Sequence, residues 1–224
     1  MKQRFFIIYI LVFFFGATVI VAGPVQAQDF QGGGASIYLG AGTPNSIDAA
    51  SDIAADLNIN DETGNFVFGV LGFYQADKFR MGAAFQMHAW AGVNPGTEDV
   101  EDDAAGVMAV IWGVYSTYTI KHDRFLMNVG AIVGSGRAVL GFSYGEEDID
   151  ENESVDTLYI EPLISFGVAA CRWFGAEFQV SAPLFFLSQD LELDWAGETY
   201  TVESSEMSGV NVSLKLTFGK IADP

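Results

Sequence analysis

Apolar and polar residues alternate along several stretches of this chain. In the last of these stretches, Val210 to Phe218, every second residue is apolar, and the residues between them are Asn211, Ser213, Lys215 and Thr217. The same alternation runs through 79–88 and 174–184. A period of two places the apolar side chains on one face of a β-strand and the polar ones on the other. This pattern is typical of a strand that separates lipid from a polar lumen.

Eight segments are rich in β-branched and aromatic residues, and they predict eight strands at 34–42, 65–74, 79–90, 107–120, 125–142, 157–169, 174–187 and 209–218. Most have the length that a tilted strand needs to cross a bilayer. The fifth is longer and changes phase near Gly134–Gly136, which predicts a bulge that turns Arg137 inward. Pro162 and Pro183 each remove a ladder hydrogen bond, so we expect a bulge or a strand end at each.

Short and long connections alternate strictly between these segments. The short ones are near 75–78, 121–124 and 171–173, and the long ones are 43–64, 91–106, 143–156 and 188–208. The long connections hold 23 of the 29 acidic residues and no Lys or Arg. Short periplasmic turns and long extracellular loops give this asymmetry in a membrane barrel. A soluble β-sandwich or a lipocalin-like barrel shares the alternation, but has no evident reason to sort loop length together with charge.

The first 27 residues have the pattern of a secretory signal. Lys2 and Arg4 precede an apolar run, and Val25-Gln26-Ala27 supplies small residues for cleavage after Ala27. An uncleaved anchor helix is the alternative. We therefore expect a signal peptide at 1–27 and one barrel domain at 28–224. The net charge of −19 argues against a nucleic-acid partner.

With its signal, eight alternating strands, loop rhythm and final strand Val210–Phe218, the chain resembles the small outer-membrane barrels of the OmpA/OmpX/opacity-protein type. The resemblance covers essentially the whole chain after the signal. It implies an all-β, eight-stranded antiparallel transmembrane barrel in a Gram-negative outer membrane. Its implied partners are membrane lipid, lipopolysaccharide and the barrel assembly machinery.

Polar residues on the predicted inner face form a candidate interior network. An eight-stranded barrel is just wide enough for side chains to fill, so charges inside it must be paired. We expect Arg137 to face Glu161 and Lys215 to face Glu177. The predicted network comprises Arg80, Gln86, His88, Asn128, Arg137, Glu161, Glu177 and Lys215, with Gln179 and Asn211 on the same face.

The third long connection carries a partial calcium-loop spacing. Asp148, Asp150, Asn152 and Ser154 match positions 1, 3, 5 and 7 of such a loop, but Glu153 replaces its glycine and Tyr159 its final glutamate. We name these four residues as a candidate metal site. Loose binding of calcium or magnesium by the loops, or a merely solvated acidic loop, are the alternatives.

Three functions remain open from the sequence. The first is a non-enzymatic surface barrel that acts structurally or through its acidic loops. The second is a small channel for ions or hydrophobic solutes. The third is a lipid A-modifying enzyme centred on His88, although no short motif brings a serine and an acid to that histidine. We expect no catalytic residues and no cofactor.

Overall fold

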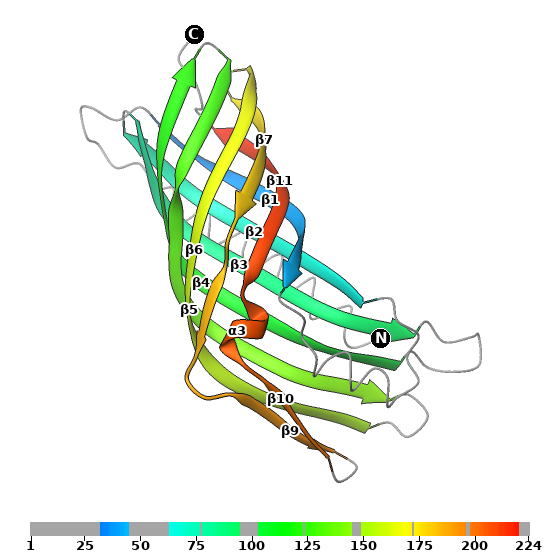
Figure 1. Cartoon of the computed structure of the whole chain (residues 1–224). Coiled ribbons are helices and arrows are strands. Elements are labelled where there is room, and N and C mark those ends of the chain that lie inside the picture. The colour runs from blue at the N-terminus through cyan, green and yellow to red at the C-terminus, as the bar shows by residue number, and fades with distance from the viewer. Residues whose placement is uncertain are drawn as a thin grey trace.

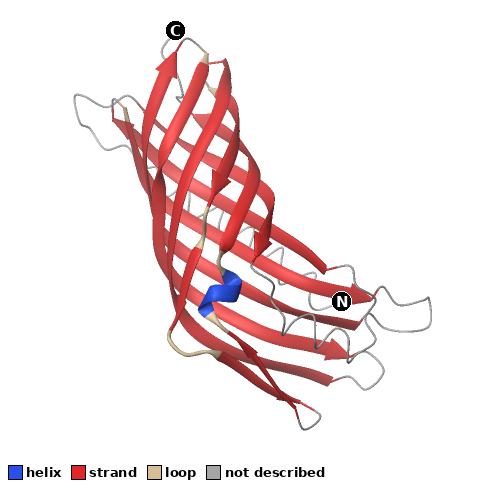
Figure 2. Cartoon of the chain, in the orientation of Figure 1, coloured by secondary structure: helices blue, strands red, loops and turns tan. Residues whose placement is uncertain are grey.

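The computed structural model describes residues 32–44, 63–76, 78–94, 103–122, 124–144, 149–171, 173–195 and 198–219. The predicted signal peptide lies outside these residues. Nearly all of the described chain is strand, and one short helix, α3 (Ser204–Met207), lies beside the strands (Figure 2). Within these ranges, no helix is long and apolar enough to cross a membrane.

Eight strands form a closed antiparallel ring (Figure 1). Each strand pairs with its neighbours along the chain, and the first pairs with the last to close the barrel. The ring consists of β1 (Gly32–Pro44), β2 (Thr63–Ala76), β3 (Phe79–Asn94), β4 (Asp103–His122), β5 (Phe125–Tyr144), β6 (Ile149–Cys171), β7 (Phe174–Ser181) and β11 (Gly209–Gly219). The predicted fold class is therefore confirmed.

The three predicted short turns are confirmed, and each joins its two strands through only two residues, at 77–78, 123–124 and 172–173. The third long connection is shorter than predicted. β5 and β6 remain paired up to Tyr144 and Ile149, so only 145–148 separate them. Much of the predicted loop 143–156 is therefore strand. β5 and β6 continue to pair there, although this part of β6 is rich in acidic residues.

The outer face of the ring is apolar through most of its height. Side chains such as Trp112, Val114, Leu158 and Phe166 are exposed there. The neighbouring positions point inward and are polar near the short turns, as with Thr117, Thr119, Ser165 and Thr217. Only a lipid environment suits such an outer surface, and a closed ring leaves no unpaired strand edge in that environment.

This polarity reverses toward the end that carries the long connections. Ala138 and Leu140 of β5 are fully buried inside, whereas Arg137 points outward and is exposed. The pairing of β5 with both neighbours is regular through Gly134–Gly136. The predicted bulge is therefore wrong. The pattern changes phase because the strand leaves lipid for water, so its polar side becomes the outer one.

Of the two prolines, Pro183 interrupts its strand without shifting the register, whereas Pro162 lies within the continuous strand β6. β7 and β8 (Leu184–Leu187) both pair with β6 in the same register on either side of the break at Ala182-Pro183. Pro162 lies opposite this break and accepts a hydrogen bond from the Ala182 N–H through its carbonyl at 3.0 Å. The predicted strand end is therefore correct at Pro183. At Pro162 β6 continues with neither a bulge nor a strand end, so the prediction for that position is wrong. The register shift of β6 with β7 lies elsewhere, between Ala169 and Cys171.

The fourth long connection is a folded unit. It contains a hairpin of β9 (Leu191–Trp195) and β10 (Glu198–Val202), followed by α3. In Figure 1 the hairpin lies at the end of the barrel opposite the C-terminus. Leu191, Leu193, Tyr200 and Val202 of the hairpin are buried and join the apolar cluster that contains Leu140. The hairpin therefore packs onto the inner side of the extended strands.

Candidate functional site

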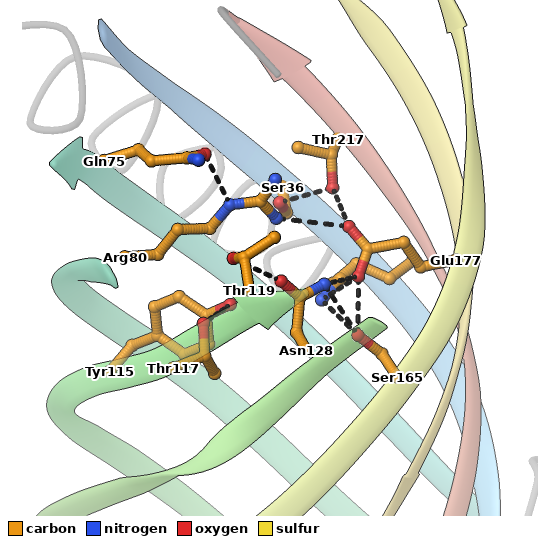
Figure 3. Close-up of polar contacts among 11 residues, drawn as sticks. Ser36, Gln75, Arg80, Tyr115, Thr117, Thr119, Asn128, Ser165, Glu177 and Thr217 are labelled. Carbon is orange, nitrogen blue, oxygen red and sulfur yellow. Dashed lines mark hydrogen bonds and ion pairs between the residues drawn. The ribbon is translucent and has the colours of Figure 1, made fainter. Parts of the chain in front are cut away.

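The barrel interior near the short turns is organised around Glu177. This side chain comes from β7 and lies directly opposite Lys215 of β11 in the strand register. The Lys215 Nζ lies 2.7 Å from one Glu177 carboxylate oxygen, and the Arg80 Nη1 lies 3.4 Å from the other. All three side chains are almost completely buried. The predicted pairing of Lys215 with Glu177 is present. Arg80 adds a second cation to it (Figure 3).

Uncharged polar groups meet most of the remaining hydrogen-bonding capacity of this triad (Figure 3), and the Arg80 Nη2 has no hydrogen-bond partner among the described residues. The Asn128 amide and the Ser165 hydroxyl each donate to Glu177 at 2.6 Å, and the Thr217 hydroxyl donates at 3.2 Å. The Arg80 Nε donates to Gln75 at 2.9 Å, and its guanidinium lies 5.1 Å from the centre of the Phe73 ring. Buried ions are tolerated when their remaining hydrogen-bonding capacity is met in this way. This arrangement therefore plugs the lumen.

The middle of the interior holds a second polar group. Gln86 donates a hydrogen bond to Glu161, and the Tyr159 hydroxyl lies 3.1 Å from His88 Nε2. All four residues are buried. The His88 ring stacks on Trp90 at 5.8 Å and meets the edge of Phe185 at 5.2 Å. This group therefore lies between the polar half of the lumen and an aromatic layer that contains Trp90 and Phe185.

Apolar side chains fill the lumen beyond this aromatic layer. They come from the inner faces of β4, β5 and β6 and from the underside of the hairpin. The packed set includes Val107, Ala109, Ile111, Ala138, Leu140, Val155, Leu191, Leu193, Tyr200, Val202 and Met207. This apolar plug therefore occupies the lumen between the aromatic layer and the hairpin.

The structure places seven of the eight predicted interior residues inside the barrel; Arg137 is the exception. Its side chain is 71 % exposed and its Nε lies 3.4 Å from Asp156, not near Glu161. The prediction failed because it relied on a bulge that β5 does not contain. The hydroxyl partners Ser165 and Thr217 were not singled out from the sequence, although both occupy alternate positions on the polar face.

The candidate metal residues do not form a calcium loop in the described chain. Asp150, Asn152 and Ser154 belong to the extended strand β6, whereas Asp148 lies outside the described residues. In a strand, residues two apart are separated by about 6.6 Å, so they do not curl around one ion. Among the described residues, no group of three or more His, Cys, Asp or Glu side chains has the arrangement of a metal site.

The surroundings of His88 do not form a nucleophilic site. Its polar contact among the described residues is the Tyr159 hydroxyl, and aromatic rings occupy its remaining neighbourhood. A serine nucleophile must lie within hydrogen-bond reach of the histidine that activates it. No such serine contact is present at His88 in the described part of the chain.

Comparison with known proteins gives structural neighbours only. No protein-family model matches the sequence, and no curated protein matches it either. The chain is similar to Ail, the attachment invasion locus protein of Yersinia pestis, solved in complex with the heparin analogue sucrose octasulfate. The two are 10% identical, with a TM-score of 0.48, and the match covers 84% of this chain and 97% of Ail.

Two further solved structures are similar to the chain. Neisserial surface protein A is 12% identical with a TM-score of 0.46, covering 85% of this chain and 97% of that protein. The N-terminal β-barrel domain of Pseudomonas aeruginosa OprF is 10% identical with a TM-score of 0.36, covering 87% and 99%.

The features of the chain itself decide its class. Eight antiparallel strands close into a ring, lipid-compatible side chains cover its outer wall, and the buried Glu177 is paired with Lys215 within it. Closed barrels of this kind are the form in which strands span a membrane, and in bacteria they occupy the outer one. The chain therefore has the architecture of a small eight-stranded outer-membrane β-barrel.

Proposed function

We propose that this protein is a non-enzymatic surface barrel whose extracellular end serves as an interaction platform. The observation that carries the proposal is the apolar plug. Leu191, Leu193, Tyr200 and Val202 hold the β9–β10 hairpin against the end of the barrel. A packed plug suits a platform better than a pore, since conduction needs a continuous wet path. It also fixes the orientation of the hairpin's outer face.

The outer face of the hairpin is acidic. Glu192 and Asp194 are exposed on β9, beside the exposed Thr199 and Thr201 of β10. Glu198 alternates with these two threonines and is exposed at the tip of the hairpin. Such a surface attracts cations and repels anions. We therefore infer a cationic partner, such as a basic protein segment. Weak calcium or magnesium binding at the same surface remains part of this proposal.

A binding assay tests the acidic face. Protein in nanodiscs is mixed with a fluorescent oligolysine peptide, and sucrose octasulfate serves as the anionic control probe. We expect the peptide to bind and the octasulfate not to bind. The triple variant E192Q/D194N/E198Q should weaken peptide binding about tenfold, whereas T201A on the same face should not change it. Equal peptide binding by the triple variant and wild type would reject the role of the acidic face.

Conductance and lipid chemistry test the two alternatives. In planar bilayers we expect the folded wild type to give no steady current, because the plug and the Glu177 triad fill the lumen. A steady current would favour the channel. Lipid A from cells that overproduce the protein should be chemically unchanged, and a modified lipid A would favour the enzyme.

A further inference from the structure

Between the Glu177 triad and the aromatic layer, five strands place polar side chains in the lumen that do not contact the triad's carboxylate. They come from β1, β3, β6, β7 and β11, and each is at most 4% exposed. We call this set the polar layer, and it consists of Tyr38, Gln86, Glu161, Gln179 and Asn211.

Strand pairing brings the polar layer together. The Tyr38 hydroxyl lies over Gly69, where a Cβ atom would be 2.2 Å from its oxygen, and Gly69 pairs directly with Gln86. The members on β6, β7 and β11 lie one or two inward positions beyond Glu177 and its partners Ser165 and Lys215. The interior of an eight-stranded barrel is only wide enough for side chains, so these groups face one another across the lumen.

Each member of the polar layer has a buried polar atom that lacks a hydrogen-bond partner within the described chain. These atoms are the hydroxyl oxygen of Tyr38, Oε1 of Gln86, Oε1 of Glu161, both amide atoms of Gln179, and Nδ2 of Asn211. Buried polar groups are nearly always bonded in native proteins, so a set of this kind indicates bound water or a bound ion. Oxygens from four different strands belong to the set.

The charge of Glu161 favours an ion over water alone. Its Oε2 accepts a hydrogen bond from the Gln86 amide, and its carboxylate forms no ion pair with any described residue. The predicted partner Arg137 is exposed on the outside, and the buried Arg80 and Lys215 contact the triad's own carboxylate. Buried charges are usually paired or bound to a metal ion. The polar layer therefore offers one negative charge and several neutral oxygens to a cation.

We propose that the polar layer binds one monovalent cation, sodium or potassium, through Glu161 and the oxygens of Tyr38, Gln86 and Gln179. Carboxylate and neutral oxygens are the ligands that hard cations prefer. One carboxylate balances one positive charge, so a monovalent ion fits better than calcium or magnesium. Water on the ion accepts hydrogen bonds from the amide nitrogens of Gln179 and Asn211. The inference is independent of the acidic hairpin and of its proposed partner.

Thallium(I) locates the site, because it replaces sodium or potassium and scatters X-rays anomalously. Crystals of the wild-type protein prepared in thallium acetate should show one anomalous peak in contact with Glu161 and Gln86. Crystals of E161Q should lack this peak, since the variant keeps the shape of the side chain but removes its charge. Water without an anomalous peak in the wild-type polar layer would overturn the proposal.

The dependence of stability on the cation tests the site in solution. The full protein is unfolded with urea in detergent that contains sodium, potassium or choline chloride at equal ionic strength. A ligand that binds only the folded protein stabilises it by mass action, so tenfold more sodium at saturation should raise the ratio of folded to unfolded protein about tenfold. Choline is too large to enter the polar layer and should give no such increase. Equal stabilisation by choline would overturn the proposal.

Three variants connect this effect to the polar layer. E161Q should lose the sodium dependence, and Q179M, which lacks one of the oxygens, should need about tenfold more sodium for the same stabilisation. E153Q is the matched control, because it makes the same substitution at an exposed position of the same strand, and it should keep the wild-type dependence. Wild-type sodium dependence in Q179M would overturn the proposal even where E161Q fails to fold, and so would a loss in E153Q equal to that in Q179M.

Discussion

Glu177 shows how a narrow barrel accommodates charge. The carboxylate lies between Arg80 and Lys215, whose nitrogens are 3.4 Å and 2.7 Å from its two oxygens. Two cations and one anion thus share one enclosed space. An isolated buried ion costs several kcal/mol, so removal of one partner is far more damaging than loss of an exposed pair.

This balance predicts the stability of single and double variants. E177Q leaves Arg80 and Lys215 without their carboxylate and should lower the free energy of unfolding by about 3–5 kcal/mol. The double variant E177Q/K215M should lose less than the sum of the two single losses, because it also removes an orphaned charge. Urea titration in detergent measures these values. The exposed E198Q is the control and should stay within about 0.5 kcal/mol of wild type.

At the scale of elements, the strands and short turns were predictable because alternation and turn length are local properties. The predicted inward orientation of Arg137 was wrong. A period of two tells which side of a strand is apolar, but not whether that side faces lipid or a core. β5 passes from one environment to the other, so its apolar side changes from outer to inner at Gly134–Gly136 with no change of register. The hairpin's packing was beyond prediction, since it depends on contacts between distant segments.

Cysteine labelling checks this reversal. In a C171S background, R137C should react rapidly with a water-soluble maleimide, because position 137 is exposed. A138C should react only after unfolding, because Ala138 is fully buried. Rapid labelling of A138C and slow labelling of R137C in the folded protein would instead support the predicted bulge.

Ser204 of α3 and Ser208, which follows it, supply hydrogen-bond acceptors to the edge of β8 that faces away from its partner β6. The Phe185 N–H donates to the Ser208 hydroxyl at 3.2 Å, and the Leu187 N–H donates to the Ser204 hydroxyl at 2.9 Å. Alanine at both serines leaves these two donors without partners. We expect S204A/S208A to lower the free energy of unfolding by about 1–3 kcal/mol, measured by urea titration. The neighbouring S205A should have little effect, and an equal loss in S205A would contradict this role.

At the scale of the whole molecule, closure of the ring makes the fold cooperative. β1 pairs with β11 along nearly its whole length, so the first and last strands of the ring meet in one seam. Unheated protein should therefore migrate on a denaturing gel as a compact species and shift after boiling. The shifting band should be in the outer-membrane fraction. A wholly soluble periplasmic protein would contradict the barrel's place in the membrane.

The polarity reversal also fixes the hydrophobic thickness that the barrel requires. Between the row of Arg137 and the short turns, outward apolar side chains extend from Trp112 to Ile120 on β4 and from Leu158 to Val168 on β6. At about 3.4 Å per residue and a tilt of about 40°, these stretches span about 20–26 Å of membrane. That is less than the core of an average bilayer and suits the thin outer membrane. The barrel should therefore refold more completely in short-chain than in long-chain phosphatidylcholine, because a thicker bilayer would draw Arg137 and Asp156 into hydrocarbon.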